Sequence, residues 1–312
     1  MEQKYLIAMD GSGPSMVTAH YAAAMLPKEG SEIVLFLVEF DIPESFWDIY
    51  PEPETRLYKE SMVEWAGRQS KSFASSLEMA RKVFINAGFP EKAVTIKMQR
   101  RKTGITRDIV AESLDGYAAV FAGRKGFSNL SRLPVGSIAR KLVSRIQNLP
   151  LVLVGDNPET RHVLIGFDDS HGSRRCLHLA ADLFGGRDKQ FHIRHVARSI
   201  GGFSGLSAEE AEGGSTAQAE QEYARKLKIE PALAQAAQLL QEKGVASENV
   251  DTGIIHGYVS RSLGLIDTAE REKWGTLLVG RRGLSRIQDF LIGRVGEKLV
   301  EMAREQTVWI IS

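Results

Sequence analysis

The segment GRKGFSNLSRLPVGSI, residues 123–138, constrains the fold of this chain more than any other stretch of the sequence. Its three glycines follow the spacing G-x2-G-x9-G, and they are Gly123, Gly126 and Gly136. An apolar run, residues 118–122, precedes the segment and apolar residues at helical spacing follow it, so the segment joins a strand to a helix. A glycine-rich turn before a helix lets backbone N–H groups approach an anion closely. The segment therefore predicts a phosphate site.

The same glycine spacing recurs near the end of the chain, in GRRGLSRIQDFLIGRV. The glycines of this second copy, each 157 positions after its counterpart, are Gly280, Gly283 and Gly293. The chain has 312 residues, which is more than one hydrophobic core usually covers. The repeat therefore predicts two tandem domains, residues 1–156 and 161–312, joined by a turn-rich linker, GDNPETR.

Apolar runs alternate with helical patterns in both halves of the chain. In the first half the runs are residues 5–9, 33–40, 94–98, 118–122 and 151–154. In the second half they are residues 163–167, 191–196, 250–255, 276–279 and 308–311. Continuous apolar runs suit strands that are covered on both faces in a parallel sheet. We therefore expect an α/β protein made of two Rossmann-like domains, each with a five-stranded parallel sheet flanked by helices.

Two regions after the second strand of each half differ in character. In the first half a long helix, from about residue 54 to 87, has a predicted buried stripe of Met62, Trp65, Phe73, Leu77, Ala80 and Phe84. Aromatic residues around the start of this helix form either a partner surface or a lid over their own domain; they are Phe46, Trp47, Tyr50 and Tyr58. In the second half, residues 199–218 are rich in Gly, Ser, Ala and Glu, which predicts a mobile loop.

The composition argues against several classes of function. Forty Lys and Arg residues balance 39 Asp and Glu residues, so the overall charge favours neither nucleic acid nor an acidic membrane. No stretch approaches the ~20 apolar residues that a membrane helix needs. The single cysteine, Cys176, cannot form an internal disulfide and is expected to pack as a small apolar residue. We expect a cytoplasmic protein that binds neither membrane nor nucleic acid.

Ligands of open α/β sheets bind at the carboxyl ends of the strands, where the strand order reverses. Asp10, Val38 and Gly123 all fall at such strand ends. The Asp10 carboxylate either accepts bonds from an adenine amino group or a ribose hydroxyl, or merely caps the following helix. The basic residues of the two glycine loops either screen phosphate charge or lie at a solvated loop tip; they are Arg124, Lys125, Arg281 and Arg282.

Two other nucleotide-binding motifs are incomplete. The sequence Gly11-Ser12-Gly13 resembles the start of the dinucleotide motif G-x-G-x-x-G, but Met16 replaces its third glycine. Asp10 would also place negative charge beside the pyrophosphate. A P-loop needs G-K-[ST], whereas Gly126 is followed by Phe127 and Ser128.

The sequence predicts no catalytic residue and no metal site. His192 and His195 are three apart on an expected strand, so their side chains point to opposite faces and cannot chelate one metal ion. We interpret both as ordinary sheet residues. No pair of residues has the character of a general base and its nucleophile. Rapid enzymatic turnover is therefore not expected, and slow ATP hydrolysis is the most that we expect.

The first half resembles the ATP-binding branch of the universal stress protein family. The resemblance rests on D-x-S after the first strand, here Asp10-Gly11-Ser12, and on the loop G-x2-G-x9-G followed by Ser137. It implies an adenine nucleotide alpha hydrolase-like fold that binds ATP, with or without Mg²⁺. The adenine-side positions that it implies are Ala8, Asp10 and Val38, and Ser12 of the D-x-S motif is a further binding position. The phosphate-side positions are Gly123, Gly126, Gly136, Ser137 and Ile138.

The second half resembles another copy of the same family, with one departure. Its corresponding positions are Asp168, Val196, Gly280, Gly283, Gly293 and Arg294. Arg294 stands where the ATP-binding members have Ser or Thr, and a guanidinium there either pairs with a phosphate or fills the phosphate site. We favour occlusion, which makes the second domain a degenerate nucleotide site.

The resemblance also implies a function and an assembly. We expect a regulatory protein of the stress response that binds an adenine nucleotide and changes its contacts with a protein partner. In single-domain relatives the last strands of two subunits pair, so residues 151–154 and 308–311 are expected to meet as an intrachain pseudo-dimer, and a homodimer of the chain is also expected. Two alternatives stay open: a scaffold that binds no nucleotide, and an enzyme that adenylates a substrate.

Overall fold

The computed structural model describes the chain apart from residues 1–2, 40–55, 127–134, 199–215 and 282–293. The chain forms two compact units, Met1–Leu151 and Val152–Ser312. Parallel strands alternate with helices in both units, which confirms the predicted α/β class with five strands from each half of the sequence. The predicted domain limits, residues 156 and 161, stay a prediction.

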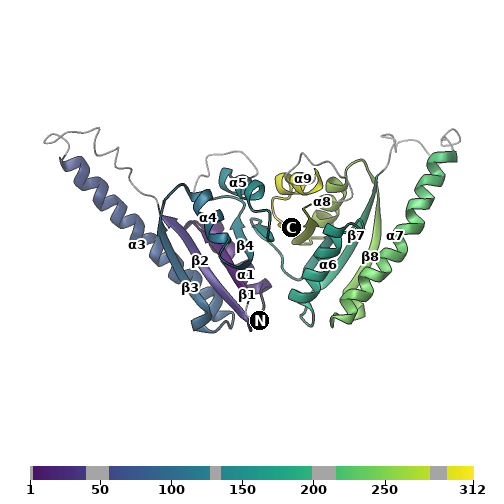
Figure 1. Ribbon diagram of the computed structural model, residues 1–312, viewed down its shortest axis with the longest axis horizontal. Helices are drawn as coiled ribbons and strands as arrows, with labels where there is room; N and C mark the ends of the chain where they lie inside the picture. Colours follow the sequence, from purple (N-terminus) through teal and green to yellow (C-terminus); the bar gives the residue numbers. More distant parts are fainter. Residues whose placement is uncertain (1–2, 40–55, 127–134, 199–215, 282–293) are drawn as a thin grey trace. The chain divides into compact units, whose positions relative to one another are not determined.

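The first unit is a doubly wound sheet (Figure 1). In chain order its elements are β1 (Gln3–Met9), α1 (Gly13–Met25), β2 (Ser31–Glu39), α3 (Arg56–Asn86), the 3-10 turn η1 (Glu91–Ala93), β3 (Val94–Arg100), α4 (Ile105–Ser113), β4 (Tyr117–Gly123) and α5 (Ser137–Arg145). Its strand order is β3-β2-β1-β4, and each neighbouring pair is parallel. Helix α1 packs with α3 and helix α4 packs with α5. The strand order therefore reverses between β1 and β4, where ligands of such sheets bind.

The second unit repeats this arrangement. Its elements are β5 (Leu151–Val154, which begins at the last residue of the first unit), β6 (His162–Gly166), α6 (His171–Phe184), β7 (Gln190–Arg198), α7 (Thr216–Glu242), η2 (Ser247–Asn249), β8 (Val250–Tyr258), α8 (Arg261–Arg271), β9 (Thr276–Gly280), α9 (Arg294–Met302) and β10 (Thr307–Ile311). The strand order is β5-β10-β9-β6-β7-β8. The final strands of the two sequence repeats, β5 and β10, are therefore neighbours.

The long helix α3 departs from its predicted burial. Leu77, Ala80 and Phe84 are buried, as predicted, and Met62 and Phe73 are half-buried, but Trp65 is 39% exposed, so the prediction for Trp65 is wrong. The reason is length: 31 helical residues span about 46 Å, whereas a strand of seven residues such as β3 spans about 23 Å. The amino-terminal part of α3 therefore extends past the sheet (Figure 1).

Two of the predicted regions are only partly visible. Of the aromatic residues near the start of α3, Phe46, Trp47 and Tyr50 lie outside the described residues, and the same holds for the Tyr58 side chain. In the predicted loop of the second half, residues 199–215 lie outside the described residues and α7 begins at Thr216.

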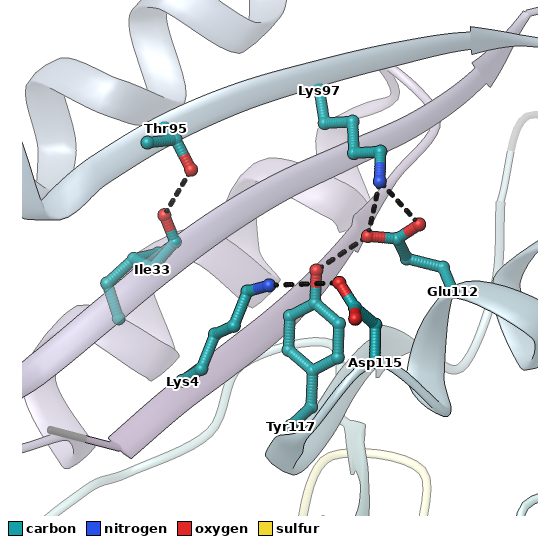
Figure 2. A network of polar contacts seen from close by, with 7 residues as sticks. All are labelled: Lys4, Ile33, Thr95, Lys97, Glu112, Asp115 and Tyr117. Carbon is teal, nitrogen blue, oxygen red and sulfur yellow. Dashed lines mark hydrogen bonds and ion pairs between the residues drawn. The ribbon is translucent and has the colours of Figure 1, made fainter. Parts of the chain in front are cut away.

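On the α4 side of the first sheet, charged side chains close the surface (Figure 2). The Lys97 ammonium lies 2.7 and 2.8 Å from the two carboxylate oxygens of Glu112. The Tyr117 hydroxyl donates to Glu112 Oε1 at 2.7 Å. Lys4 lies over the Tyr117 ring, 4.5 Å from its centroid, and pairs with Asp115 at 3.3 Å. We call this set of residues the closed face.

The equivalent side of the second sheet has different chemistry. The strand register places His192 where the first unit has Val34, and Trp274 stands where the first unit has Tyr117. The His192 ring stacks on Trp274 with 3.7 Å between ring centroids, and its Nε2 lies 3.1 Å from His162 Nδ1. Burial, followed by the nearby Arg194 guanidinium, lowers the pKa of His192 to about 4. This histidine is therefore neutral in the folded protein at pH 7.

We predict that His192 makes the second unit sensitive to acid. The unfolded chain binds a proton at this residue below about pH 6.5, whereas the folded chain, with a pKa of about 4, does not. Folding stability is then fully present above pH 6.5 and is lost as the pH falls toward 4, by up to about 1.4 kcal/mol per pH unit.

The test compares the pH dependence of urea unfolding in two variants. His192→Val, which introduces the residue found at this position in the first unit, should reduce the loss of folding stability between pH 6.5 and 4. His178→Val, at an exposed position on α6, should leave the loss unchanged. If the free energy of unfolding fell with pH equally steeply in His192→Val and in the unsubstituted protein, the prediction would be contradicted.

Candidate functional site at the carboxyl end of the first sheet

The turn between β1 and α1 is held by Asp10 and Ser12. Asp10 Oδ1 accepts hydrogen bonds from the Ser12 backbone N–H at 2.9 Å and from the Ser12 hydroxyl at 2.5 Å. Gly11 between them has φ +78°, a left-handed conformation that favours glycine. Ser12 caps α1, because its hydroxyl oxygen accepts from the Ser15 N–H at 3.3 Å. The carboxylate of Asp10 thus orients the residue that caps the helix.

The glycine loop folds back onto this turn. A Cβ on Gly126 would lie 2.5 Å from Asp10 Oδ2, so the backbone of the loop contacts the carboxylate directly. A Cβ on Gly123 would lie 3.0 Å from the Lys125 carbonyl oxygen, and one on Gly136 would lie 3.2 Å from the Arg124 carbonyl oxygen. All three glycines of the repeated spacing therefore stand where a side chain would crowd the loop.

Helix α5 begins directly after the glycine loop and leaves its first turn accessible. Gly136 is the N-cap residue and provides no side-chain cap, although its own N–H donates to the Arg124 carbonyl oxygen at 2.7 Å. The next two residues are open to solvent to different degrees: Ser137 is exposed and Ile138 is half-buried. Helices α1 and α6 differ, because a serine caps each of them. The orphan N–H groups and the dipole of α5 thus suit an anion.

The adenine-side residues lie at the same edge of the sheet. Ala8 in β1 pairs with Phe36 in β2 and with Ala122 in β4, so Val38 and Gly123, at the ends of β2 and β4, lie beside the end of β1 that leads into Asp10. Ala8 is half-buried although it belongs to a central strand. The structure therefore brings all nine predicted residues of the first half to one edge, on β1, β2 and β4, on the connections that follow β1 and β4, and at the start of α5.

The arginines of the two glycine loops are not solvated loop tips. Arg124 is 1% exposed and Arg281 is 4% exposed. Arg281 joins β9 to β10, since its N–H donates to the Ile311 carbonyl oxygen at 2.7 Å and its Nε donates to Ser312 Oγ at 3.1 Å. Lys125 is half-buried, and Arg282 lies outside the described residues.

The second unit keeps the turn of the first. Asp168 Oδ1 accepts from the Ser170 N–H at 3.2 Å, and Ser170 caps α6. Asp169 takes the place of Gly11 and has φ +59°, and its carboxylate pairs with Arg174 at 2.7 Å. The duplicated D-x-S motif thus forms the same left-handed turn twice.

The strand ends of the second unit pack more tightly against their helices. A Cβ on Gly280 would lie 3.0 Å from the carbonyl oxygen of Gly172 in the first turn of α6, whereas one on Gly123 would lie 3.5 Å from the equivalent carbonyl oxygen of Pro14. Val196 is buried in β7. Arg294 is the first residue of α9, its side chain is not described, and Gly283 and Gly293 lie outside the described residues.

The described residues bear on metal and membrane binding as well. Among them, no group of three or more His, Cys, Asp and Glu residues is placed to hold a metal ion. Every helix within the described ranges is too short or too polar to cross a bilayer.

Comparisons with known proteins bear on the family. Residues 159–311 match the model of the Universal stress protein family. The second half of the chain belongs to the universal stress protein family. No curated protein matches the chain in sequence.

Solved universal stress proteins share the fold of the whole chain. One from Archaeoglobus fulgidus is 17% identical, covers 100% of this chain and 99% of its own, and superposes with a TM-score of 0.61. Another from Pseudomonas aeruginosa is 13% identical, covers 99% of this chain and 92% of its own, with a TM-score of 0.59. A universal stress protein solved in complex with cAMP is 21% identical over 49% of this chain and 97% of its own, with a TM-score of 0.36. The first two of these structures show that the universal stress protein fold extends over both halves.

We predict that Gly126 is intolerant of a side chain because of Asp10. Gly126→Ala puts a methyl group against a carboxylate oxygen, so it should destabilise the first unit by ~1–3 kcal/mol in urea unfolding. Gly13→Ala is the matched control, because a Cβ on Gly13 meets nothing within 4 Å. In an Asp10→Ala background, Gly126→Ala should cost much less. An equal cost with and without Asp10 would show that the clash does not limit the loop.

Proposed function

We propose that the first half of this universal stress protein binds ATP or a related adenine nucleotide at the carboxyl edge of β1, β2 and β4. The observation that carries the proposal is the start of α5, which has no side-chain cap and follows a loop in which Gly126 is packed on Asp10. Backbone N–H groups there would bind the phosphates, with the Ser137 hydroxyl as a further donor. Mg²⁺ would accompany the phosphates as part of the ligand.

The adenosine part of the nucleotide would lie toward Ala8 and Val38. Both carboxylate oxygens of Asp10 lie at this edge: Oδ1 accepts from Ser12, and Oδ2 faces Gly126 of the loop. A ribose hydroxyl or an adenine amino group is a donor, so either one suits a carboxylate. The same residue would then both shape the turn and bind the nucleoside.

We further propose that the second half is a degenerate nucleotide site. Arg294 begins α9 at the position where Ser137 begins α5. A guanidinium at this position would compete with a phosphate for the start of the helix. The close approach of Gly280 to the Gly172 backbone supports this proposal, because it narrows the space between the end of β9 and the start of α6.

The role proposed for nucleotide binding is regulatory. The protein would act in the cytoplasm during stress, as an intrachain pseudo-dimer that also forms homodimers, and the bound nucleotide would change its contacts with a protein partner. Little hydrolysis is expected, because the described residues at this edge offer phosphate donors and, among them, no nucleophile with its base. A scaffold without nucleotide is the second candidate.

The first test is calorimetric titration of ATP, with and without Mg²⁺, into three variants. Ser137→Arg copies the second half and should weaken binding at least tenfold, because it removes a donor and fills the phosphate position. Ser144→Arg, two turns further along α5, is the matched control and should bind normally. Arg294→Ser should create a second binding event. Unchanged stoichiometry in Arg294→Ser together with normal affinity in Ser137→Arg would contradict the assignment.

A further inference from the structure

The second unit contains a pocket of about 630 Å³ on the α8 side of its sheet. Its walls come from β7, β8, α8 and the short connection between α8 and β9, and they include His192, Arg194, Asp251, Tyr258, Thr268 and Trp274. None of the residues that line this pocket belongs to the proposed nucleotide site. The pocket therefore needs an explanation of its own.

The first unit explains why the pocket is open. Phe36 pairs with Lys97 in the first sheet, and at the same register Arg194 pairs with Gly253 in the second sheet. Gly253 lacks the long side chain with which Lys97 reaches Glu112 across the closed face (Figure 2). Arg194 lies over Gly253 instead, with its guanidinium carbon 3.5 Å from where a Cβ would stand. The second sheet thus lacks the lysine that covers the first.

Two buried polar atoms of the pocket lining lack hydrogen-bond partners. Across the described part of the chain, Thr268 Oγ1 and His192 Nδ1 have no hydrogen-bond partner. Thr268 is 4% exposed, and the Asp251 oxygen nearest to His192 Nδ1 is 3.6 Å away, too far for a hydrogen bond. Buried hydroxyl and imidazole groups normally have partners, so both atoms point to a ligand with hydrogen-bonding groups.

The charges of the pocket cancel. Arg194 pairs with Asp251, and Arg271 pairs with Glu272 at 3.2 Å and with Asp267 at 3.5 Å. His192 adds no charge at pH 7, because burial lowers its pKa. An anion or a cation would therefore have to break an existing ion pair.

The aromatic ring of the pocket is already covered. His192 stacks on the Trp274 ring in a nearly parallel orientation, 11° between the planes, and Trp274 is only 7% exposed. The Arg194 guanidinium also lies over this ring, 5.4 Å from its centroid. A flat ligand thus has little open ring surface on which to stack, and hydrogen bonds remain as the means of recognition.

We propose that this pocket binds a small uncharged molecule with several hydroxyl groups, such as a sugar or a polyol. A hydroxyl group both donates and accepts, so it satisfies Thr268 Oγ1 and either tautomer of His192 without disturbing the ion pairs. The site is separate from the nucleotide site and does not depend on nucleotide binding.

The deciding variant is Thr268→Val, which keeps the shape of the side chain and removes the hydroxyl. Without ligand, this variant should be at least as stable to heat as the unsubstituted protein, because a buried unpaired hydroxyl is lost. With ligand, it should bind about five- to tenfold more weakly, because a hydrogen bond to the ligand is lost. Thr95→Val, at the position of the first sheet that corresponds to Asp251, should bind normally.

Binding is measured on the full chain with ¹⁵N-labelled tryptophan, with D-ribose and myo-inositol as probes. The indole signal of Trp274, assigned with Trp274→Phe, should move on titration while that of the core residue Trp309 stays in place. Inorganic phosphate and methylamine should leave the Trp274 signal unchanged. No movement with either neutral probe, equal movement with the charged probes, or unchanged affinity in Thr268→Val would overturn the proposal.

Discussion

Parallel pairing of buried strands is the constraint on which the rest of this protein depends. Because β1 pairs with both β2 and β4, three strand ends meet at one edge, and each connection must leave that edge through a turn. The first turn is held by the Asp10 carboxylate, and the glycine loop after β4 can reach that carboxylate only because Gly126 has no side chain. The strand order, the turn after β1 and the glycine loop after β4 thus depend on one another. Together they determine where the uncapped start of α5 lies.

Because the chain contains two copies of the fold, equivalent positions of the two halves can be compared directly. Both halves keep the D-x-S turn, including the left-handed residue, which is Gly11 in one half and Asp169 in the other. The halves differ in what surrounds the sheet: Lys97 and Glu112 close one face of the first sheet, while Gly253 leaves the equivalent face of the second sheet open. The two proposals made above thus assign a nucleotide to the first half and a neutral ligand to the second half.

Much of this arrangement could be predicted from the sequence, because its signals are local and occur twice. The apolar runs predicted the strands, and the glycine spacing predicted the junction at residues 123–138. Trp65 was predicted wrongly because helical periodicity shows which face of α3 is apolar but does not show where the sheet ends. The pocket of the second unit was not predicted, because it depends on the strand register that places Gly253 beside Arg194. The alternation of His192 and Arg194 along β7 was the one available signal, since a doubly covered strand is expected to be apolar throughout.

The central claim is that one half of the chain binds nucleotide and the other does not. The most direct measurement is to denature freshly purified protein, identify the released nucleotides by mass, and count them per chain after saturation with ATP and Mg²⁺. We predict one adenine nucleotide per chain. Two per chain would contradict the proposed asymmetry between Ser137 and Arg294, and none would contradict nucleotide binding and favour the scaffold.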